Sequence, residues 1–378
     1  MKKHRRGHNE GSIYQRKDGR WVAGQTLEGR KRVYYYGKTR AEVQAKLLAG
    51  LKATHDGISI AQDGRKSVEQ YVLTWLKSIK PQVKPKTYTT YEGLVRLHIV
   101  PALGKVKLVK LTPEHLQRFY SERIDTGLSP QSVRHMNAVL HRALEDAVRW
   151  NNVARNVADL VTPPRVERRE MKVLAPEEAR RFLDTVRTER IGALYILAIT
   201  TGLRQGELLA LRWRDVDLEA RSLRITGTLQ RGEAGLAIAA PKTATSRRQV
   251  LLGTMAIEAL RDHRIRQNAE RLLLGPAWEN NDLVFANEVG RPIEATNLLR
   301  RSFKPLLKAA GVPAIRFHDL RHSAATLLLS QGIHPKVVSE MLGHAQVGIT
   351  LNLYSHVTPT MQRQAADAMD SLLGATRL

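Results

Sequence analysis

An arginine that directly follows a glycine turn is the first candidate for chemistry in this sequence. In residues 201–208 (TGLRQGEL), Arg204 stands where a helix is expected to begin, and Leu208 is expected to point into the core. Helix N-termini and guanidinium groups both bind phosphate oxygens well. Glu207 lies three residues further on, on the same helix face, where it can orient the guanidinium. A plain surface ion pair between Arg204 and Glu207 is the alternative interpretation.

A second segment, residues 318–322 (HDLRH), combines two histidines with an arginine. His318 and Arg321 are three residues apart, so both side chains project to one side of a helix. The pair suits phosphoryl chemistry, because the arginine neutralises charge and the histidine handles protons. The rival interpretation is a zinc helix, since His318 and His322 are four residues apart. The metalloprotease pattern, however, has Glu directly after its first histidine, whereas Asp319 stands here.

A histidine and a tyrosine further along the chain complete the set of candidates. Residues 342–344 (LGH) predict a helix that ends at a glycine and leaves His344 at an exposed helix end. Ten residues later, Tyr354 stands in the segment 350–356 (TLNLYSH). A lone tyrosine is more often a packing residue than a nucleophile. The company of two histidines and two arginines in separate short motifs favours Tyr354 as a nucleophile.

These candidates lie in a mixed but mostly helical region from residue 173 onward. A helix is expected to begin at Pro176, and a buried helix is expected to run from Ile191 to Thr200 and end at Gly202. Further helices are expected near 254–273, 295–310, 318–331, 335–342 and 359–373, and strands at 222–229, 236–240 and 248–252. Residues 173–378 are therefore predicted to form the largest domain, mostly helical with β-hairpins.

A small basic domain is predicted at residues 1–60. Short β-prone runs and turn pairs predict a three-stranded antiparallel sheet; they lie at 12–14, 20–23 and 32–36, with turns at 18–19 and 28–29. Thr39 can then cap one covering helix. The first 40 residues hold twelve Lys or Arg against three acids. A basic sheet of this kind is a plausible DNA reader, and a solvated extension is the alternative.

An all-helical domain is predicted at residues 65–162. Four helices fit between about 67 and 152, because cap residues stand at Ser67, Thr112 and Ser129. A helix that opens at Thr87 is expected to end before Pro101, since proline interrupts a helix interior. Residues 163–172 then read as a charged, proline-led hinge.

The composition limits the classes of protein to which this chain belongs. Its 378 residues suggest two or three domains, and 42% hydrophobic residues suffice for ordinary cores. A net charge of +25 attracts polyanions, of which nucleic acid is the commonest. There are no cysteines, which excludes disulfides, thiolate catalysis and Cys-ligated zinc, while 13 histidines keep His/carboxylate metal sites open. Since no signal peptide or apolar run of about 20 residues is present, a cytoplasmic nucleic-acid binder is expected.

With these motifs in this order, the sequence resembles the tyrosine recombinases, or phage-type integrases, over nearly the whole chain. Lys242, between strand-like segments, occupies the place of the lysine on the family's β-hairpin. Residues 101–104 (PALG) lie in a helical region that resembles the family's core-binding domain. The basic N-terminal sheet resembles the arm-binding domain of integrases that hold two DNA sites. The resemblance thus implies an α+β multidomain fold.

The resemblance also implies a mechanism. Tyr354 would attack the scissile phosphate, giving a 3′-phosphotyrosyl link and a free 5′-hydroxyl, with Glu207 in a supporting role. Arg204 and Arg321 would clamp the phosphate, and Lys242 would be the general acid. His318 would assist proton transfer, and His344 would donate a hydrogen bond to the phosphate. Because this transesterification is isoenergetic, no metal, ATP or other cofactor is expected.

The expected partners follow from the same family. They are double-stranded DNA at core and arm sites, and three further copies of the chain in a tetramer on DNA, linked by the helix near 359–373. An excisionase or a DNA-bending protein would be an accessory partner, and the site of action would be the nucleoid of a bacterial cell that carries a phage or mobile element. Three other functions are weighed against this one, namely a non-catalytic DNA-binding regulator, a type IB topoisomerase and a metal-dependent phosphodiesterase that uses His318 and His322.

Overall fold

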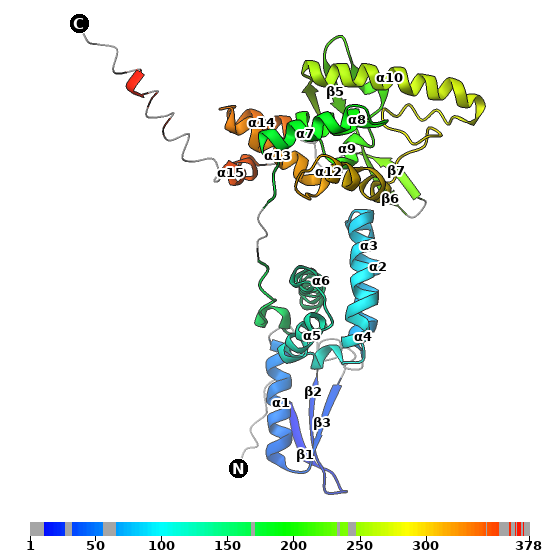
Figure 1. Cartoon of the computed structure of the whole chain (residues 1–378). Helices are drawn as coiled ribbons and strands as arrows, with labels where there is room; N and C mark the ends of the chain where they lie inside the picture. Colours follow the sequence, from blue (N-terminus) through cyan, green and yellow to red (C-terminus); the bar gives the residue numbers. More distant parts are fainter. Residues whose placement is uncertain are drawn as a thin grey trace. The chain divides into compact units, whose positions relative to one another are not determined.

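The structure, a computed structural model (Figure 1), divides the chain into two compact units, Met1–Arg168 and Arg169–Leu378. The residues that it describes are 11–26, 32–55, 66–167, 171–232, 235–240, 247–344, 346–354, 363, 367, 369–371 and 373. Small antiparallel sheets accompany many helices in both units, so the predicted α+β class is confirmed.

The first unit begins with the three-stranded sheet that the sequence predicts. Its strands are β1 (Ser12–Gln15), β2 (Trp21–Thr26) and β3 (Arg32–Gly37), in the order β1-β2-β3 and antiparallel throughout. Helix α1 (Arg40–His55) packs on this sheet, burying Ala23 of β2 against Val43 and Leu47. A small apolar core therefore holds the sheet and the helix together.

The first expected turn and the expected helix cap of this region are both found in the structure. Gly19 adopts a φ of +83° between β1 and β2, a conformation that glycine favours. The Thr39 hydroxyl accepts a hydrogen bond from the backbone N–H of Glu42 at 3.2 Å, so the predicted cap of α1 is confirmed. The second expected turn, at residues 28–29, lies outside the described residues.

The helical part of the first unit forms around one apolar core. Its helices are α2 (Val68–Ile79), α3 (Pro85–Leu94), α4 (Val100–Leu103), α5 (Pro113–Asp125) and α6 (Pro130–Arg149). Ser67, Thr112 and Ser129 cap α2, α5 and α6 as predicted. The Trp75 side chain is fully buried, and its indole N–H donates to Asp146 of α6 at 2.8 Å. The polar end of this large side chain is thus satisfied where it crosses between helices.

The expected break before Pro101 is wrong. The helical path begins at Pro85, not at Thr87, and continues through Pro101 to Leu103. A π-helical turn, Val95–Ile99, stands just ahead of the proline. Such a widened turn absorbs the steric crowding and the missing N–H that proline brings to a helix interior. Burial of apolar side chains along this path favours its continuation.

The second unit is mostly helical. Its helices are α7 (Pro176–Val186), α8 (Gly192–Thr201), α9 (Gln205–Leu208), α10 (Thr254–Leu274), α11 (Ala295–Leu298), α12 (Lys304–Ala309), α13 (Phe317–Ser330), α14 (Pro335–Leu342) and α15 (Val347–Tyr354). Helix α8 is buried on nearly all sides and packs on α7, α10 and α13. A π-helical turn, Leu299–Phe303, joins α11 to α12, so the helical run expected at 295–310 is confirmed.

Two small sheets complete the second unit. One has the order β4-β5-β8, and the other is the hairpin β6-β7. The strands are β4 (Val216–Asp217), β5 (Ser222–Ile225), β6 (Thr228–Gly232), β7 (Gly235–Ala239) and β8 (Arg248–Leu251). The single strand expected at 222–229 is wrong, because the chain changes sheets at Gly227. A Cβ at Gly227 would lie 2.6 Å from Ile238, so only glycine fits this crossing.

Near the end of the chain, the structure contains one helix that the sequence does not predict. Helix α15 is not predicted, because its sequence, VGITLNLY, is rich in β-branched residues and glycine, which are weak helix formers. Packing against α13 and α14 overrides that preference. The helix expected near 359–373 falls largely outside the described residues. Within the part of the chain that is described, no helix is long and apolar enough to cross a membrane.

Candidate active site

Arg204 is held at the junction of α8 and α9. Helix α8 ends at Gly202, which adopts a φ of +64°, and Arg204 is the residue that precedes α9. The Glu207 carboxylate accepts a bond from the backbone N–H of Arg204 at 3.0 Å and from its Nη1 at 2.7 Å. Because Glu207 is only 4% exposed, this is not a surface ion pair. Glu207 orients the guanidinium, as the sequence suggests.

Arg321 approaches the same place from α13. Its side chain is buried, and its two terminal nitrogens donate to the carbonyl oxygens of Gly202 at 2.8 Å and Leu342 at 2.7 Å. Burial, followed by the charge of Arg204, lowers the pKa of Arg321 below its ordinary value. The group nevertheless keeps its charge at neutral pH, since a guanidinium is not deprotonated in proteins. Two cations therefore meet at the end of α8.

A third arginine, Arg248 of β8, joins them. Arg248 donates a hydrogen bond to the backbone carbonyl of Met341 at 2.7 Å. Arg321 donates to the carbonyl of Leu342 at 2.7 Å, and Arg204 donates to that of Gly343 at 3.2 Å. These carbonyls end α14, where helix carbonyls lack partners within the helix and carry partial negative charge. The C-terminus of one short helix thus gathers three guanidinium groups, which together with Glu207 we call the arginine clamp.

Glu207 is the carboxylate shared within the arginine clamp. Its two oxygens accept from Arg248 at 3.0 and 3.3 Å, in addition to the bonds from Arg204. Burial alone would raise the pKa of Glu207, but the hydrogen bonds and charges of Arg248 and Arg204 together lower it. Three guanidinium groups face one carboxylate, so the clamp keeps a net positive charge. The clamp is therefore suited to an anion that accepts hydrogen bonds through two oxygens, such as a phosphodiester.

The two predicted histidines line the cationic site. His318 lies in the first turn of α13, and burial, then the charges of His322, Arg321 and Arg204, lower its pKa to about 4. Burial and the charges of Arg321 and Arg204 likewise lower the pKa of His344 to about 4. Both rings are therefore neutral at physiological pH, and each can donate one N–H.

The surroundings of His344 correct one expectation. Gly343 ends α14 with a φ of +69°, as predicted, but His344 is half-buried and not exposed. Its Nδ1 lies 2.8 Å from the hydroxyl of Thr350, a buried residue of α15. When this hydroxyl donates to Nδ1, the neutral ring carries its proton on Nε2. The helix that carries Tyr354 thus fixes His344 through Thr350.

Two predicted catalytic residues are described only in part or not at all. Tyr354 is the last residue of α15, which packs against α13 and α14, but its side chain lies outside the described residues. Lys242 lies in the segment 241–246, which is also outside them. The structure therefore brings together Arg204, Glu207, His318, Arg321 and His344, and places the backbone of Tyr354 on an adjoining helix.

Sequence reasoning missed Arg248 and Thr350. Arg248 follows another arginine at the start of a strand, and alternation along a strand says only that one of two neighbours points inward. Thr350 lies one helical turn before Tyr354, a spacing that indicates a shared face once α15 is known to be a helix. Neither signal identifies by itself which residues Arg248 and Thr350 contact.

The histidine pair considered for zinc is in direct contact. The rings of His318 and His322 meet edge to face, with their centroids 4.8 Å apart. Among the residues that the structure describes, no group of three or more His, Asp or Glu side chains is placed to hold a metal ion.

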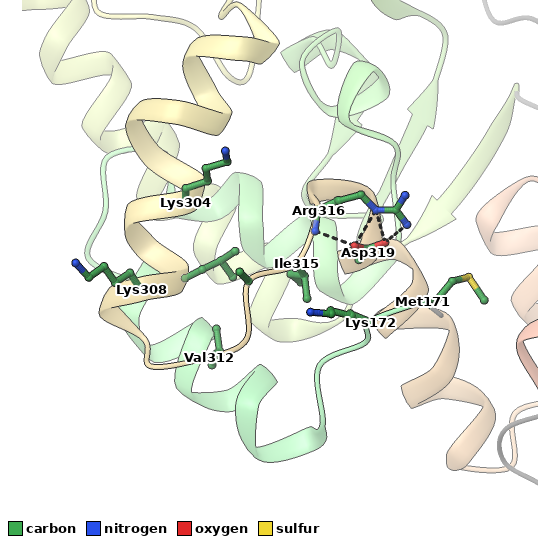
Figure 2. Close-up of a pocket in the computed structure, with 10 residues that line it drawn as sticks. Met171, Lys172, Lys304, Lys308, Val312, Ile315, Arg316 and Asp319 are labelled. Carbon is green, nitrogen blue, oxygen red and sulfur yellow. Dashed lines mark hydrogen bonds and ion pairs between the residues drawn. The ribbon is translucent and has the colours of Figure 1, made fainter. Parts of the chain in front are cut away.

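A separate hollow of about 970 Å³ lies beside the start of α13 (Figure 2). Lys172, Lys304 and Lys308 line it and are exposed, while Ile315, which also lines it, is buried. No predicted site residue that the structure describes lines this hollow. Its lysines add positive charge outside the arginine clamp.

Two family models match the chain. The model described as "Phage integrase family" matches residues 172–361, and that described as "Phage integrase, N-terminal SAM-like domain" matches residues 67–123. The first match contains the whole arginine clamp, and the second lies within the helical part of the first unit.

Curated relatives and solved structures agree with these matches. A "Tyrosine recombinase XerC-like" protein of Caldanaerobacter subterraneus is 33% identical, over 89% of this chain and 91% of the relative. An integrase of Streptomyces ambofaciens is 31% identical, over 97% of both chains. The Tn1549 transposon integrase in complex with transposon right end DNA has a TM-score of 0.68 at 22% identity, covering 82% of this chain and 100% of that one. A lambda integrase tetramer on a Holliday junction has a TM-score of 0.57 at 18% identity, covering 88% and 95%.

The structural neighbours show the fold, whereas the family model and the sequence relatives carry the assignment further. The first family model spans half of the chain, and the two relatives exceed 30% identity over nearly their whole lengths. The chain therefore belongs to the phage integrase family, and it is a site-specific DNA recombinase of the tyrosine type.

Proposed function

We propose that Tyr354 attacks a scissile phosphate held in the arginine clamp. The phenolic oxygen forms a bond to phosphorus, and the bond from phosphorus to the 5′-oxygen breaks. The product is a 3′-phosphotyrosyl link and a free 5′-hydroxyl, and reversal of the step on another strand rejoins the DNA. The observation that carries this proposal is the clamp itself, in which carbonyls anchor three guanidinium groups and a single carboxylate binds two of them.

The described residues divide the work on the phosphate. Arg204 and Arg321 neutralise the non-bridging oxygens, which gain charge in the transition state. His344 donates a hydrogen bond from Nε2, in the tautomer that Thr350 supports. His318 assists proton transfer, which suits a ring that is neutral at physiological pH. Lys242 is assigned as the general acid to the departing 5′-oxygen, on the resemblance alone.

The test is a DNA duplex nicked next to the cleavage site, which traps the covalent intermediate. We expect the wild-type protein to form a DNA adduct that survives denaturing electrophoresis, also in EDTA, and Tyr354→Phe to form none. Tyr88→Phe, which changes a tyrosine of the other compact unit, should retain the adduct. An adduct that persists in Tyr354→Phe would contradict the assignment, and cleavage abolished by EDTA would favour a metal-dependent phosphodiesterase.

We further infer that four copies act together on DNA. The neighbour that is a tetramer on a Holliday junction supports this assembly. Met369 and Leu373, four residues apart in the last part of the chain, are 54% and 70% exposed, as expected of a segment that docks on another copy. Deleting residues 359–378 should impair pairing of two DNA sites more than folding. Unchanged recombination by the truncated protein would contradict this role.

The two parts of the first unit are proposed to bind DNA outside the cleavage site. We assign residues 1–60 to arm sites and residues 65–162 to the core site, with 173–378 as the catalytic domain. Exposed tyrosines on the basic sheet, Tyr14, Tyr34 and Tyr36, support a surface that contacts nucleic acid. The substrate would be the attachment site of a mobile element in a bacterial nucleoid, with an excisionase or DNA-bending protein as accessory.

A further inference from the structure

Arg248 has a role that neither the sequence motifs nor the family assignments give it. Only 8% of its side chain is exposed, although it begins an outer strand of a small sheet. Its Nε donates to the carbonyl of Met341 at 2.7 Å, while Nη2 and Nη1 donate to the two oxygens of Glu207 at 3.0 and 3.3 Å. One planar group therefore connects the end of α14 to the carboxylate of α9.

Both supports of Arg204 touch Arg248. The first is Glu207, which binds the backbone and Nη1 of Arg204 with the same two oxygens that Arg248 holds. The second is Gly343, whose carbonyl accepts from Nη2 of Arg204 at 3.2 Å. A Cβ on Gly343 would lie 3.0 to 3.1 Å from the Arg248 side chain, so the two groups pack directly together.

We propose that Arg248 is a positioning residue for strand cleavage, which sets the Arg204 guanidinium against the scissile phosphate by fixing both Glu207 and Gly343. This inference rests on the proposed function, since it concerns the same phosphate. Arg248 does not touch the substrate in this role, because its polar atoms are engaged by the protein. Its effect passes through Arg204 and, by way of Gly343, to the adjacent His344.

A guanidinium is required for this geometry. It presents its N–H groups in a rigid plane that can bind a carboxylate at two points and a carbonyl at a third, whereas a lysine ammonium is a compact charge on a flexible stem. Arg248→Lys therefore keeps the charge but loses the fixed arrangement. Arg261→Lys is the matched control, because Arg261 forms an exposed ion pair with Glu219 on the surface of the same unit.

The experiment measures the rate of covalent adduct formation on the nicked duplex, with DNA binding and thermal unfolding measured in parallel. Misplacement of a catalytic group by about 1 Å can cost on the order of 100-fold in rate. We expect a loss of that order in Arg248→Lys and in Arg248→Gln, with DNA affinity retained. Arg261→Lys should cleave as the wild type does. Wild-type rates in both Arg248 variants, or variants that are unfolded at the assay temperature, would overturn the proposal.

A second substrate separates positioning from a general loss of structure. A methylphosphonate at the scissile position lacks the negative charge that the clamp neutralises, so the exact placement of Arg204 matters less there. The deficit of Arg248→Lys relative to wild type should therefore shrink at least about tenfold on this substrate. A deficit of equal size on both substrates would indicate a merely structural role and overturn the proposal.

A double variant tests the route through Glu207. If Arg248 acts by way of this carboxylate, Arg248→Gln combined with Glu207→Gln should lose little more activity than the more impaired single variant. Losses that multiply would contradict that route. The outcome remains distinct from failure of the proposed function, because that failure appears in the wild type as the absence of a Tyr354-dependent adduct.

Discussion

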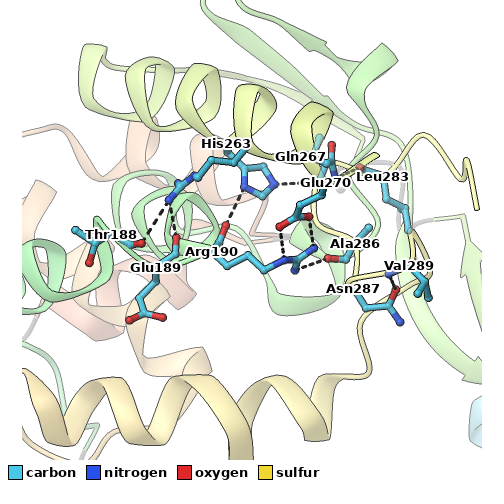
Figure 3. A network of polar contacts seen from close by, with 12 residues as sticks. Thr188, Glu189, Arg190, His263, Gln267, Glu270, Leu283, Ala286, Asn287 and Val289 are labelled. Atoms are coloured by element: carbon cyan, nitrogen blue, oxygen red, sulfur yellow. Dashed lines mark hydrogen bonds and ion pairs between the residues drawn. The ribbon is translucent and has the colours of Figure 1, made fainter. Parts of the chain in front are cut away.

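Two networks of polar side chains in the second unit contain similar residue types but have different roles. The arginine clamp gathers Arg204, Arg248 and Arg321 around one carboxylate and the carbonyls at the end of α14. The other network lies between α10 and the loops around residues 190 and 285 (Figure 3). There Arg190 makes two bonds of 2.7 Å to Glu270 and one of 3.0 Å to the carbonyl of Ala286.

The neutral members of the second network also bind backbone carbonyls. His263 is buried, with its ring nitrogens 3.2 Å from the carbonyl of Arg190 and 2.7 Å from that of Val284. Gln267 donates to the carbonyls of Leu283 and Val284, both at 3.1 Å. In both networks, side chains satisfy loop or helix-end carbonyls that would otherwise be buried without partners.

The difference between the networks is their balance of charge. Arg190 has a carboxylate of its own in Glu270, so these two side chains form a neutral pair, which holds α10 on its loops. In the clamp, Glu207 is the one carboxylate for three guanidinium groups: it binds Arg204 and Arg248, while Arg321 is held by carbonyl oxygens. A carbonyl orients a guanidinium without cancelling its charge. Positive charge is thereby kept for an incoming phosphate.

The largest effect expected from this comparison is on cleavage by Arg321→Lys. This change keeps the charge but removes the two-point anchorage on Gly202 and Leu342. We expect the rate of adduct formation to fall on the order of 100- to 1,000-fold, as for loss of a preorganised charge-stabilising group. DNA affinity, measured by gel shift, should change little. Arg190→Lys is the matched control in the neutral pair, and an equal loss of cleavage rate in both variants would contradict the proposed difference between the networks.

A smaller effect is expected at two glycines with similar backbones. Gly343 and Gly332 have φ values of +69° and +77°, so alanine at either position should cost about 1–2 kcal/mol of folding stability. Only at Gly343 would the new Cβ press on Arg248, at 3.0 to 3.1 Å, while Gly332 faces open space. Gly343→Ala should therefore lose about tenfold or more in cleavage rate, and Gly332→Ala should retain it. Equal cleavage rates in the two glycine variants, at equal folding stability, would show that the clamp tolerates the displacement of Arg248.

A stability effect without an effect on chemistry is expected in the neutral pair of Arg190 and Glu270. Glu270→Gln removes the charge partner of Arg190, and both side chains are about a third exposed. We expect a loss of about 1–2 kcal/mol in the free energy of unfolding, less than for a fully buried pair. Thermal or urea unfolding measures this loss, and the cleavage rate below the unfolding transition should be that of the wild type. A large loss of cleavage in a folded Glu270→Gln protein would refute the division between the networks.

Much of this architecture can be predicted because its signals are local. Ser67, Thr112 and Ser129 cap helices by bonds to residues three positions away, and Arg204 with Glu207 are a pair of the same spacing. The continuation of α3 through Pro101 and the formation of α15 are not local, because packing decides both. Sequence-based reasoning therefore misses them.

The clamp shows the same limit at the level of the site. Arg321 and Arg248 are fixed by backbone carbonyls at Gly202, Met341 and Leu342, and every residue type has a backbone carbonyl. Only the folded chain shows which carbonyls stand at an open helix end beside an arginine. The motifs thus identify Arg204 and Arg321 as candidates, whereas the reason they converge, and the presence of Arg248, come from the structure.

The smallest effect expected is on the titration of histidines. The pKa values of His318 and His344 are about 4, below the ordinary value near 6.5, because burial and neighbouring cations disfavour the charged ring. As pH falls from about 6.5 towards 4, the unfolded chain takes up these protons first. The contribution of the two neutral rings to stability is therefore complete above about pH 6.5 and is lost through that window.

NMR titration of the imidazole signals can separate the two networks. In the DNA-free protein, His318 and His344 should titrate near pH 4, and binding of a duplex that carries the target phosphate should raise both pKa values, because the anion offsets the charge of the clamp. Burial also lowers the pKa of His263, but its ring nitrogens face the carbonyls of Arg190 and Val284 and no member of the clamp, so DNA should leave its titration unchanged. If DNA shifts His263 as much as the other two, or leaves all three unshifted, then the clamp is not where the phosphate binds.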